Sequence, residues 1–188
     1  LSEVSITAVG IDQSTNQIRH GKKIEPASVL VRSSAEKLPF HDSFFDAAIA
    51  CLVLEHIEKF EESFREVSRV VKSGGRFVLA MNHPLLQSPG SSWVEDWTSD
   101  PPEKYWRVGS YLREETSEEY FGDGISIPFT HRPLSRYLNA LSDSGFVTTR
   151  MIEPEPFSAT EEDSKWKSET AFIPRLLVLV CEKSSGSN

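Results

Sequence analysis

The sequence predicts an α/β fold with a mostly parallel sheet and helices on both of its faces. The main evidence is the stretch from Ser34 to Met81, where an apolar run, a charged amphipathic segment, a Gly-Gly pair and a second apolar run follow one another. That order is typical of two parallel strands joined by a right-handed crossover helix. The apolar runs are nearly continuous, as expected of strands that helices cover on both sides.

The composition favours a single domain over residues 1–188. Of the 188 residues, 38% are hydrophobic and 26% charged, which allows one sizeable core. The net charge of -8 and the lack of a Lys/Arg-rich run disfavour a phosphate backbone or an anionic membrane as partner. The apolar run from Phe172 to Cys181 is interrupted by Pro174 and Arg175 and is too short to span a bilayer. We therefore expect neither nucleic acid nor a membrane as partner.

The two cysteines, Cys51 and Cys181, both lie in apolar, strand-like runs. We expect them to be buried thiols in a reducing compartment, without a disulfide between them. The first ten residues lack the basic start and long apolar core of a signal peptide. These features predict a cytoplasmic protein.

The N-terminal part predicts a strand, an acidic tip, a helix and a second strand. The β-branched run from Ser5 to Ile11 ends at Asp12. Ser14 is a good helix N-cap, and we expect Gly21 to close the short helix that follows it. Ser28 to Arg32 then predicts a second strand, and a polar loop follows.

Phe45 to Leu54 predicts a central strand, because it is nearly continuous in apolar residues. Lys59 to Lys72 has the pattern of an amphipathic helix, which we expect to end at Gly74 and Gly75. Arg76 to Met81 predicts the next buried strand.

The segment from Asn82 to Thr130 does not continue the alternating pattern. It holds three of the four tryptophans among many acidic residues. A segment of this length between core elements is typically either a functional lid or disordered, and its aromatic residues argue against disorder. Residues 82–130 are therefore predicted to form an aromatic-rich insert that covers a substrate.

The C-terminal part predicts one more helix and two more strands. Pro133 can begin a helix that runs to about Ser144 and stops at Gly145. Phe146 to Ile152 and Leu176 to Glu182 predict the last strands. The acidic loop between them is too charged for a core, and the tail at residues 184–188 is predicted to be disordered.

Ligands of an open parallel sheet bind beyond the carboxyl ends of its strands, so the residues just after each strand matter most. Asp12 can accept hydrogen bonds from both hydroxyls of a nucleoside ribose, or it can simply cap a helix. The loop from Ser34 to Glu36 can bind an adenine edge through its backbone, or it can be an ordinary turn. The next predicted strand brings Cys51, Leu52, Glu55 and His56 to the same edge.

These motifs, taken in order, resemble one family. The order AVGID, SSAEKLPF, FDAAIACLVLEHI, KSGGRFVLAMNHP and FTHRPLSRYLNALSDSGF is similar to that of class I S-adenosylmethionine-dependent methyltransferases of the small-molecule, methyltransferase type 11-like kind. The resemblance covers Ser5 to Ile152 and the final strand. It implies a Rossmann-like sheet with an antiparallel last strand, S-adenosyl-L-methionine as cofactor, and methyl transfer to a small-molecule substrate.

The resemblance also implies the residues that bind the cofactor. They are Asp12, Gln13, Ser34, Ala35, Glu36, Cys51, Leu52 and His56. Asp12 and Gln13 match the ribose-binding position, and Ser34 stands where the family often has an Asp facing the adenine amino group. Ala35 would offer its backbone N–H to the adenine ring.

Cys51 and Leu52 match the positions that line the floor under the methionine moiety. His56 matches a frequent His after this strand. It can equally be a residue at a helix start with a local hydrogen bond.

One family motif has no counterpart in this sequence. The family carries a first strand and a glycine-rich turn before the ribose-binding acid, whereas the only Gly before Asp12 is Gly10. We expect a segment upstream of Leu1, or a truncated relative that serves as a non-catalytic binding or dimerisation module. A sheet without that strand has exposed edges, which a second copy of the chain could cover as a homodimer.

Methyl transfer from a sulfonium mainly requires alignment of the nucleophile and exclusion of water. His83 and His131 are weak candidates for a general base, and each is also compatible with a structural role. An aromatic wall for the substrate is predicted from Trp93, Tyr105, Trp106 and Tyr111, with a satellite core as the alternative. No motif predicts a metal site. A nicotinamide-dependent dehydrogenase would share the feature at Asp12 but fits the later motifs poorly.

Overall fold

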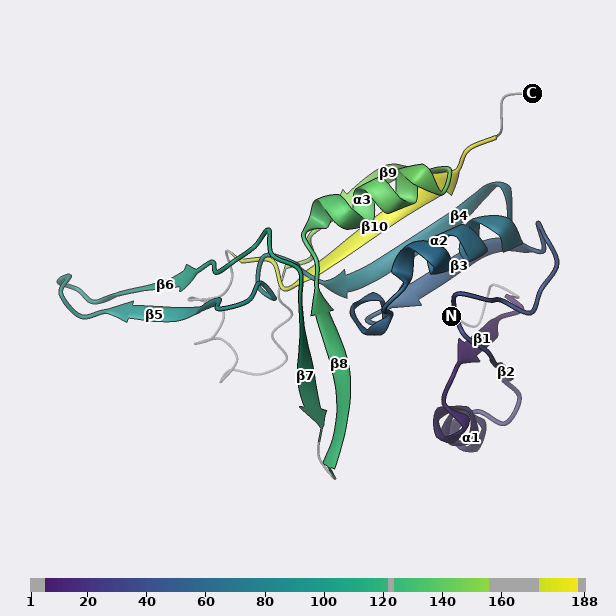
Figure 1. The fold of residues 1–188 in the computed structure, drawn as a ribbon, viewed down its shortest axis with the longest axis horizontal. Helices are drawn as coiled ribbons and strands as arrows, with labels where there is room; N and C mark the ends of the chain where they lie inside the picture. Colours follow the sequence, from purple (N-terminus) through teal and green to yellow (C-terminus); the bar gives the residue numbers. More distant parts are fainter. Residues whose placement is uncertain (1–5, 122–123, 156–172, 186–188) are drawn as a thin grey trace.

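The computed structural model describes residues 6–121, 124–155 and 173–185. Its largest sheet has four strands in the order β3-β4-β10-β9, and three two-stranded sheets surround it (Figure 1). The helices and strands are β1 (Val9–Asp12), α1 (Thr15–Ile24), β2 (Val29–Arg32), β3 (Phe45–Cys51), the 3-10 turn η1 (Leu54–His56), α2 (Phe60–Val70), β4 (Val71–Asn82), β5 (Ser92–Asp96), β6 (Glu103–Arg107), β7 (Glu115–Phe121), β8 (Ile125–His131), α3 (Leu134–Asp143), β9 (Phe146–Ile152) and β10 (Leu176–Lys183).

The four-stranded sheet confirms the predicted α/β fold. β3 and β4 are parallel and are joined through α2, as the motif from Ser34 to Met81 predicts. β10 is antiparallel to both β4 and β9. The last strand is therefore the antiparallel one in an otherwise parallel sheet.

The hydrophobic core lies between this sheet and the two helices α2 and α3. Phe60 and Phe64 of α2 and Tyr137 of α3 are almost completely buried against Phe77 and Leu79 of β4. Burial of one such aromatic side chain contributes about 1.5–3 kcal/mol. Lys183 adds a polar tie, because its Nζ donates to the carbonyl oxygens of Ser68 (2.6 Å) and Val71 (2.9 Å) at the end of α2.

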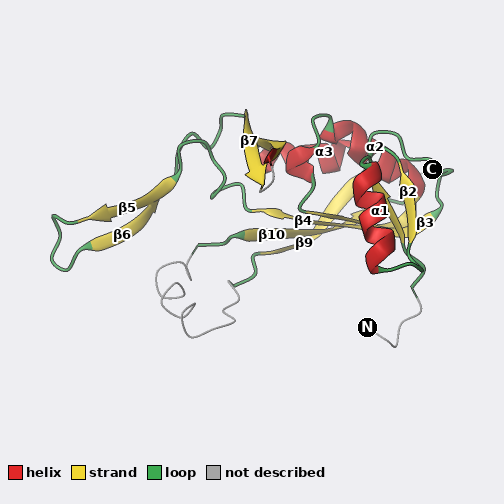
Figure 2. Cartoon of the chain, turned by 90° about the horizontal axis from the view of Figure 1, so that it is seen from below, coloured by secondary structure: helices red, strands yellow, loops and turns green. Residues whose placement is uncertain are grey.

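Helices cover one face of the four-stranded sheet in the described part of the chain. Figure 2 shows α2 and α3 on the same side, and α1 packs on β1 and β2 instead. The opposite face carries exposed apolar side chains, among them Ile49 (76% exposed) and Val147 (56%). Helices were predicted on both faces of the sheet, and among the described residues they cover one face.

β3 lies at the edge of its sheet, so the prediction of a central strand is wrong for the described residues. The strand also ends at Cys51, because Leu52 adopts a positive φ of 50° that interrupts the extended backbone. Cys51 is exposed, contrary to prediction, since it lies on the uncovered face of this edge strand. Cys181 is buried as predicted, burial raises its pKa, and neither thiol forms a disulfide.

β1, α1 and β2 form a separate unit in which the two short strands pair in parallel. The helix continues through Gly21 to Ile24, although Gly21 was predicted to close it. A Cβ at Gly21 would lie 2.8 Å from Leu30 Cδ1, so this glycine allows the helix to approach β2. The helix ends where Glu25 N–H donates to the Gly21 carbonyl oxygen.

The junction between α2 and β4 differs from the predicted Gly-Gly helix stop. The helix ends at Val70 and β4 begins at once with Val71. Gly74 then adopts a φ of 72°, where the register between β3 and β4 shifts. A Cβ on Gly75 would lie 2.8 Å from the carbonyl oxygens of Asp46 and Lys72, so only glycine fits this bend without displacing backbone.

The segment from Asn82 to Thr130 forms two antiparallel hairpins, β5–β6 and β7–β8, that extend away from the sheet (Figure 1). The sequence predicts no strands between Asn82 and Thr130. The other predicted elements, α3, β9 and β10, agree with the structure, and Gly145 follows α3 with a φ of 80°. Much of the predicted acidic loop (residues 156–172) and the end of the tail (186–188) lie outside the described residues.

Candidate functional site

The candidate site lies at the carboxyl ends of the parallel strands. The arrows of β1, β3 and β4 point the same way in Figure 1, and Asp12, Leu52 and Asn82 lie at or directly after the carboxyl ends of these strands. This is the edge at which open α/β sheets bind ligands.

Asp12 is exposed at the end of β1. Its Oδ1 accepts a hydrogen bond of 2.7 Å from Ser14 N, and Ser14 in turn caps α1 through its hydroxyl. No hydrogen bond to Oδ2 is found among the described residues. Asp12 therefore supports the start of α1 and still has one oxygen available to a ligand.

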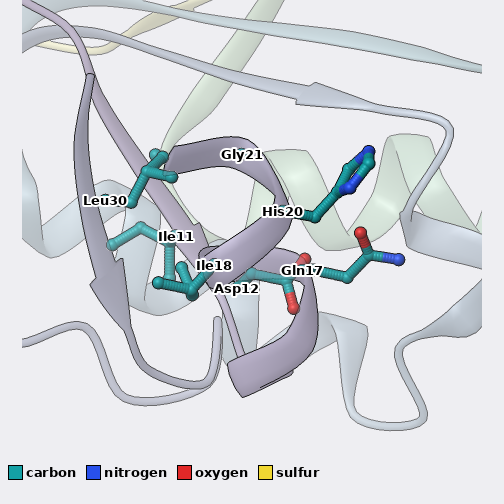
Figure 3. A pocket seen from close by; sticks show the side chains of 8 residues that line it. Ile11, Asp12, Gln17, Ile18, His20, Gly21 and Leu30 are labelled. Carbon is teal, nitrogen blue, oxygen red and sulfur yellow. The ribbon is translucent and has the colours of Figure 1, made fainter. Parts of the chain in front are cut away.

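A shallow cavity of about 250 Å³ adjoins Asp12 (Figure 3). Strand residues Ile11 and Leu30 form its apolar side, and Gln17 and His20 of α1 lie at its polar side. Its volume is below the range of about 300–1,000 Å³ that is usual for whole small-molecule ligands. The cavity is thus large enough for only part of a nucleoside cofactor.

The loop after β2 carries Ser34, Ala35 and Glu36. Ser34 Oγ accepts from Glu36 N (3.2 Å) and its carbonyl oxygen accepts from Lys37 N (3.3 Å), so this segment forms a turn. Ala35 packs against the main core and fixes the turn on the sheet. The alternative of an ordinary turn therefore describes its geometry, and adenine binding by the same backbone stays a prediction.

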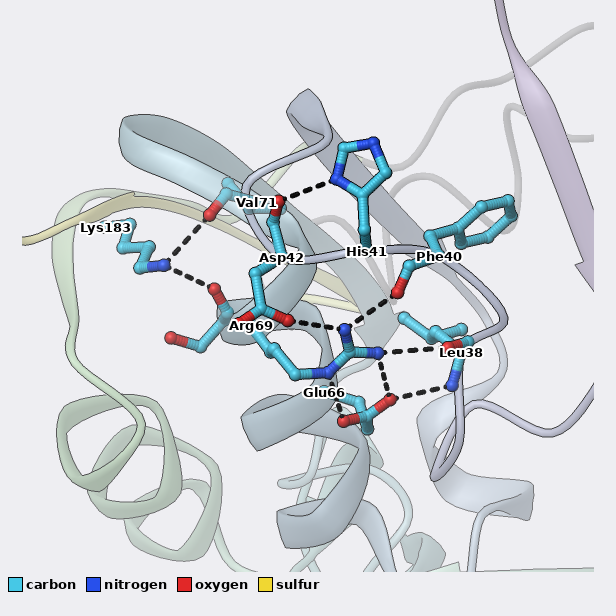
Figure 4. Close-up of polar contacts among 9 residues, drawn as sticks. Leu38, Phe40, His41, Asp42, Glu66, Arg69, Val71 and Lys183 are labelled. Atoms are coloured by element: carbon cyan, nitrogen blue, oxygen red, sulfur yellow. Dashed lines mark hydrogen bonds and ion pairs between the residues drawn. The ribbon is translucent and has the colours of Figure 1, made fainter.

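Arg69 of α2 holds the rest of this loop (Figure 4). Its guanidinium donates to the carbonyl oxygens of Leu38 (3.0 Å) and Phe40 (2.8 Å), and it pairs with Asp42 and Glu66. Glu66 also accepts from Leu38 N at 2.8 Å. The hydrogen bond from Arg69 lowers the pKa of Glu66 below its ordinary value, so Glu66 remains charged near neutral pH.

At the end of β3, Leu52 has a positive φ, which is rare for a residue with a branched side chain. Its N–H donates to the Ala80 carbonyl oxygen (2.8 Å), while its side chain stays 46% exposed beside exposed Cys51. Backbone strain of this kind is concentrated at functional sites. Cys51 and Leu52, the two residues predicted to lie under the methionine moiety, are therefore both exposed at the candidate edge.

The turn η1 is fixed from outside its own strand. Arg132 is 4% exposed, donates to the carbonyl oxygens of Leu54 (3.2 Å) and Ile57 (2.9 Å), and lies 4.6 Å from the centre of the Phe60 ring. His56 Nδ1 lies 2.8 Å from the Pro128 carbonyl oxygen and therefore donates to it. This hydrogen bond joins η1 to β8 and is not local, in contrast to the alternative considered for His56.

Glu55 links η1 to the end of β4. Its side chain is buried, and its Oε1 accepts hydrogen bonds from Asn82 N (2.8 Å) and Asn82 Nδ2 (3.2 Å). Its Oε2 is buried without a hydrogen bond in the described part of the chain. The residues after β3 and β4 are therefore held in one fixed arrangement.

A larger cavity, of about 440 Å³, lies at the end of β4. It is lined by Asn82, Leu86, Gln87, Trp93, Trp106, Ile173 and Arg175. Trp93 and Trp106 are cross-strand partners in the β5–β6 hairpin, with ring centres 5.3 Å apart and planes at 79°. The volume lies within the usual range for small-molecule sites.

The four aromatic residues predicted to contact substrate divide into two groups. Trp93 and Trp106 line this cavity together. Tyr105 is 48% exposed and is adjacent to Trp106 in β6, so its side chain points to the other face of the hairpin. The Tyr111 hydroxyl accepts from Leu134 N (3.0 Å) and supports the start of α3.

The two histidines predicted as weak base candidates are both buried. His83 Nδ1 accepts from Leu85 N (3.1 Å), so Nε2 carries the proton and donates to Glu153 Oε1 at the same distance. His131 Nε2 donates to the Tyr111 carbonyl oxygen (2.8 Å), and its Nδ1 is buried without a partner among the described residues. Nδ1 of His131 thus has no partner in the described part of the chain, whereas both nitrogens of His83 are hydrogen-bonded.

Comparison with known proteins shows what this chain is similar to. A family model described as "Methyltransferase domain" matches residues 1–79. A demethylmenaquinone methyltransferase of Paenarthrobacter aurescens is 30% identical over 86 residues, covering 45% of this chain and 34% of that protein. The enzyme of the same name from Streptomyces avermitilis is 38% identical over 77 residues, covering 40% and 33%. The chain thus spans about a third of the length of these curated relatives.

Solved structures agree over most of the chain. An S-adenosylmethionine-dependent methyltransferase from Mesorhizobium loti superposes with a TM-score of 0.77 at 25% identity, covering 93% of this chain and 79% of that one. A protein of Listeria monocytogenes assigned to the same class gives 0.74 at 26% identity, covering 94% and 80%. By sequence and fold, the chain is similar to class I S-adenosylmethionine-dependent methyltransferases. Among its described residues, no helix has the length and apolarity needed to cross a membrane.

Several residues that shape the candidate edge were not assigned a role from sequence. Glu55 lies in η1, shortly after β3, and Asn82 ends β4, so their positions gave a usable signal. Arg69 and Arg132 act through backbone carbonyl groups that are distant in sequence. No local pattern reveals such contacts, because they depend on how the helices pack on the sheet.

Proposed function

We propose that the chain transfers a methyl group from S-adenosyl-L-methionine to a small-molecule acceptor. The observation that carries this proposal is the fixed edge where Glu55 holds Asn82 beside an aromatic-lined cavity. The family supplies the cofactor class, and the cavity has the size of a small-molecule site.

The residues available at this edge fit the proposed cofactor. Asp12 has an exposed carboxylate with Oδ2 available to ribose hydroxyls, and Gln13 lies beside it. The turn at Ser34, Ala35 and Glu36 would hold the adenine. When bound, the cofactor supplies an electrophilic methyl group on a sulfonium.

Cys51, Leu52 and His56 would hold the methionine end of the cofactor. Leu52 supports this role because its side chain is half-exposed on a constrained backbone. The work of the protein is to align the acceptor with the methyl group and to exclude water, which accounts for much of the rate gain in displacements of this kind.

The acceptor proposed here is a flat, largely apolar ring. Trp93 and Trp106 offer aromatic surfaces, Leu86 and Ile173 add apolar ones, and Asn82, Gln87 and Arg175 form the polar part of the lining. The similar relatives named as demethylmenaquinone methyltransferases support a quinone-type ring as the acceptor class. In this proposal the β5–β6 hairpin covers the acceptor as a lid, and Tyr105 and Tyr111 support it from outside the cavity.

Of the two histidines predicted as base candidates, His131 has Nδ1 without a hydrogen-bond partner among the described residues, but this atom is buried and His131 lines neither cavity. His83 would act by positioning the loop after β4 through its two hydrogen bonds. The two unpaired thiols support a reducing, cytoplasmic setting.

Methyl transfer can be tested with isotopically labelled S-adenosylmethionine and a panel of hydroxylated naphthalene rings. The proposal predicts labelled ring product and S-adenosylhomocysteine in equal amounts. Asp12→Asn, which keeps one amide oxygen for Ser14 and removes the second acceptor, should weaken cofactor affinity about tenfold or more. No product with any ring, together with no cofactor binding, would contradict the proposal.

The alternative function is a non-catalytic dimerisation module. The observation that favours it is the outer edge of β3, which has no paired strand among the described residues and carries Ile49 in an exposed position. In this proposal the edge pairs with a second copy of the chain. Light scattering after size-exclusion chromatography should then give a dimer that Ile49→Lys converts to monomer, and a monomeric wild type would exclude this alternative.

A further inference from the structure

The side-chain amide of Asn82 has a defined orientation. Its Nδ2 lies 3.2 Å from Glu55 Oε1, and the Asn82 backbone N donates to the same oxygen at 2.8 Å. Glu55 Oε1 accepts from the backbone N–H and from Nδ2, so the amide arm facing Glu55 is the NH2 group. The carbonyl oxygen Oδ1 therefore occupies the other arm.

Asn82 also lines the larger cavity, together with the apolar and aromatic side chains of Leu86, Trp93 and Trp106 and the polar side chains of Gln87 and Arg175. Its Oδ1 makes no hydrogen bond within the described residues. A neutral acceptor oxygen beside an aromatic pair fits a ring that carries a hydroxyl group, because the ring packs on the indoles while the hydroxyl donates to Oδ1.

We propose that Asn82, oriented by Glu55, is a specificity-determining residue that selects rings bearing a hydroxyl over otherwise similar rings without a donor. The inference rests on the proposed function, since it assigns the acceptor class to the same cavity. Glu55 is a positioning residue in this scheme. It fixes the amide and does not touch the ligand.

Equilibrium dialysis of 2-naphthol and 2-methoxynaphthalene tests the proposal, since the two rings differ chiefly in the donor hydrogen. Wild-type chain should bind 2-naphthol about fivefold more tightly, as expected for one net hydrogen bond. Asn82→Leu should bring the ratio of the two dissociation constants to about one while it retains affinity for the ether. Glu55→Gln should also reduce the ratio, because the Gln amide can donate to Oδ1 and turn it from the cavity.

Asn139→Leu, an exposed substitution on α3, is the matched control and should leave both dissociation constants unchanged. Circular dichroism checks that each variant is folded, and if Asn82→Leu does not fold, the ratio in Glu55→Gln decides the matter, since an unchanged ratio there would overturn the proposal. Equal binding of both rings by the wild type, no binding of either ring, or an unchanged ratio in folded Asn82→Leu would overturn the proposal.

The dialysis needs no cofactor, so it separates this inference from the methyl-transfer proposal. Ring discrimination without methyl transfer would support the specificity role and contradict the activity. Methyl transfer without discrimination would do the opposite.

Discussion

The chain contains two units that share one local pattern and differ in how they are stabilised. In both β1–α1–β2 and β3–α2–β4, a helix joins two parallel strands. α2 buries Phe60, Ser63, Phe64 and Val70, whereas α1 has no buried residue. The same α/β motif is thus part of the core in one unit and a surface element in the other.

This difference separates the two halves of the candidate site. Leu52, Glu55 and Asn82 lie on the core unit and are held by buried contacts. Asp12 lies on the unit with little burial, and the loop that connects the two units is held mainly by Arg69. Regions with few buried apolar contacts open most readily, so we expect the cofactor half to gain most order on ligand binding.

The largest expected effect comes from truncation of matched helix residues. Phe64→Ala in α2 should lower the free energy of unfolding by about 3–5 kcal/mol, because it leaves a cavity in the core. Ile18→Ala in α1, where the side chain is only half-buried, should cost less than about 1 kcal/mol. Urea denaturation measures both. Similar losses in the two variants would show that the units are equally buried.

The next effect concerns the loop between the units. Arg69→Ala removes the donors to the Leu38 and Phe40 carbonyl oxygens, so residues 33–44 should exchange their amide hydrogens faster while β3 and β4 remain protected. Arg65→Ala, an exposed change one turn earlier, is the control. Hydrogen exchange with mass spectrometry measures these rates. Unchanged exchange of residues 33–44 in the Arg69 variant would show that Arg69 does not hold the loop.

The same anchor predicts an acid dependence. Because the pKa of Glu66 is lowered in the folded state, its contribution to stability is fully present above the ordinary value of 4.5 and is lost as the pH falls through the folded pKa. Glu66→Gln should therefore be less stable than wild type at neutral pH and approach it in acid. Thermal unfolding between pH 7 and about pH 3 measures the difference. A stability difference between wild type and Glu66→Gln that does not decrease in acid would contradict the stabilising role of ionised Glu66.

The core unit predicts an alkaline dependence. Burial raises the pKa of Tyr137 from 10.0 to about 12, so its contribution to stability is present below pH 10 and is lost as the pH rises towards 12. Tyr137→Phe should lose less stability over that interval than wild type. Urea titrations at pH 9 and about pH 11 measure the free energy of unfolding of both proteins. An equal loss of stability in wild type and Tyr137→Phe would show that ionisation of Tyr137 does not destabilise the core.

The smallest expected change in stability is at the aromatic hairpin. Trp106→Ala should alter the free energy of unfolding by less than about 1 kcal/mol, since the β5–β6 hairpin lies outside the main core. It should raise KM for a ring acceptor or reduce turnover. Trp97→Ala, on an exposed residue of the same insert, is the control. Unchanged kinetics of the Trp106 variant would contradict the lid role.

Local sequence patterns predict the core unit well. The apolar run after Phe45, the amphipathic helix around Phe64 and the glycine at position 145 each specify an element that the structure confirms. Family motifs also predict which strand ends form the edge. These features depend on contacts within a few residues or on periodicity alone.

The remaining features depend on tertiary packing. Neither hairpin contributes a described residue to the main core cluster, and only β8 alternates apolar with other residues, at Ile125, Ile127 and Phe129, where Pro128 weakens the strand pattern. The edge position of β3 could not be deduced from its apolar run, which resembles that of a central strand. Asn82 and Glu55 become a pair only once β4 and η1 lie side by side.

Titration calorimetry with S-adenosylmethionine tests the central claim most directly. We expect the wild-type chain to bind S-adenosylmethionine at one site. In Asp12→Asn the dissociation constant should be about tenfold or more higher, because one acceptor for the ribose hydroxyls is lost. Absence of binding to the wild type, or equal affinity in Asp12→Asn, would contradict the assignment of this edge as the cofactor site.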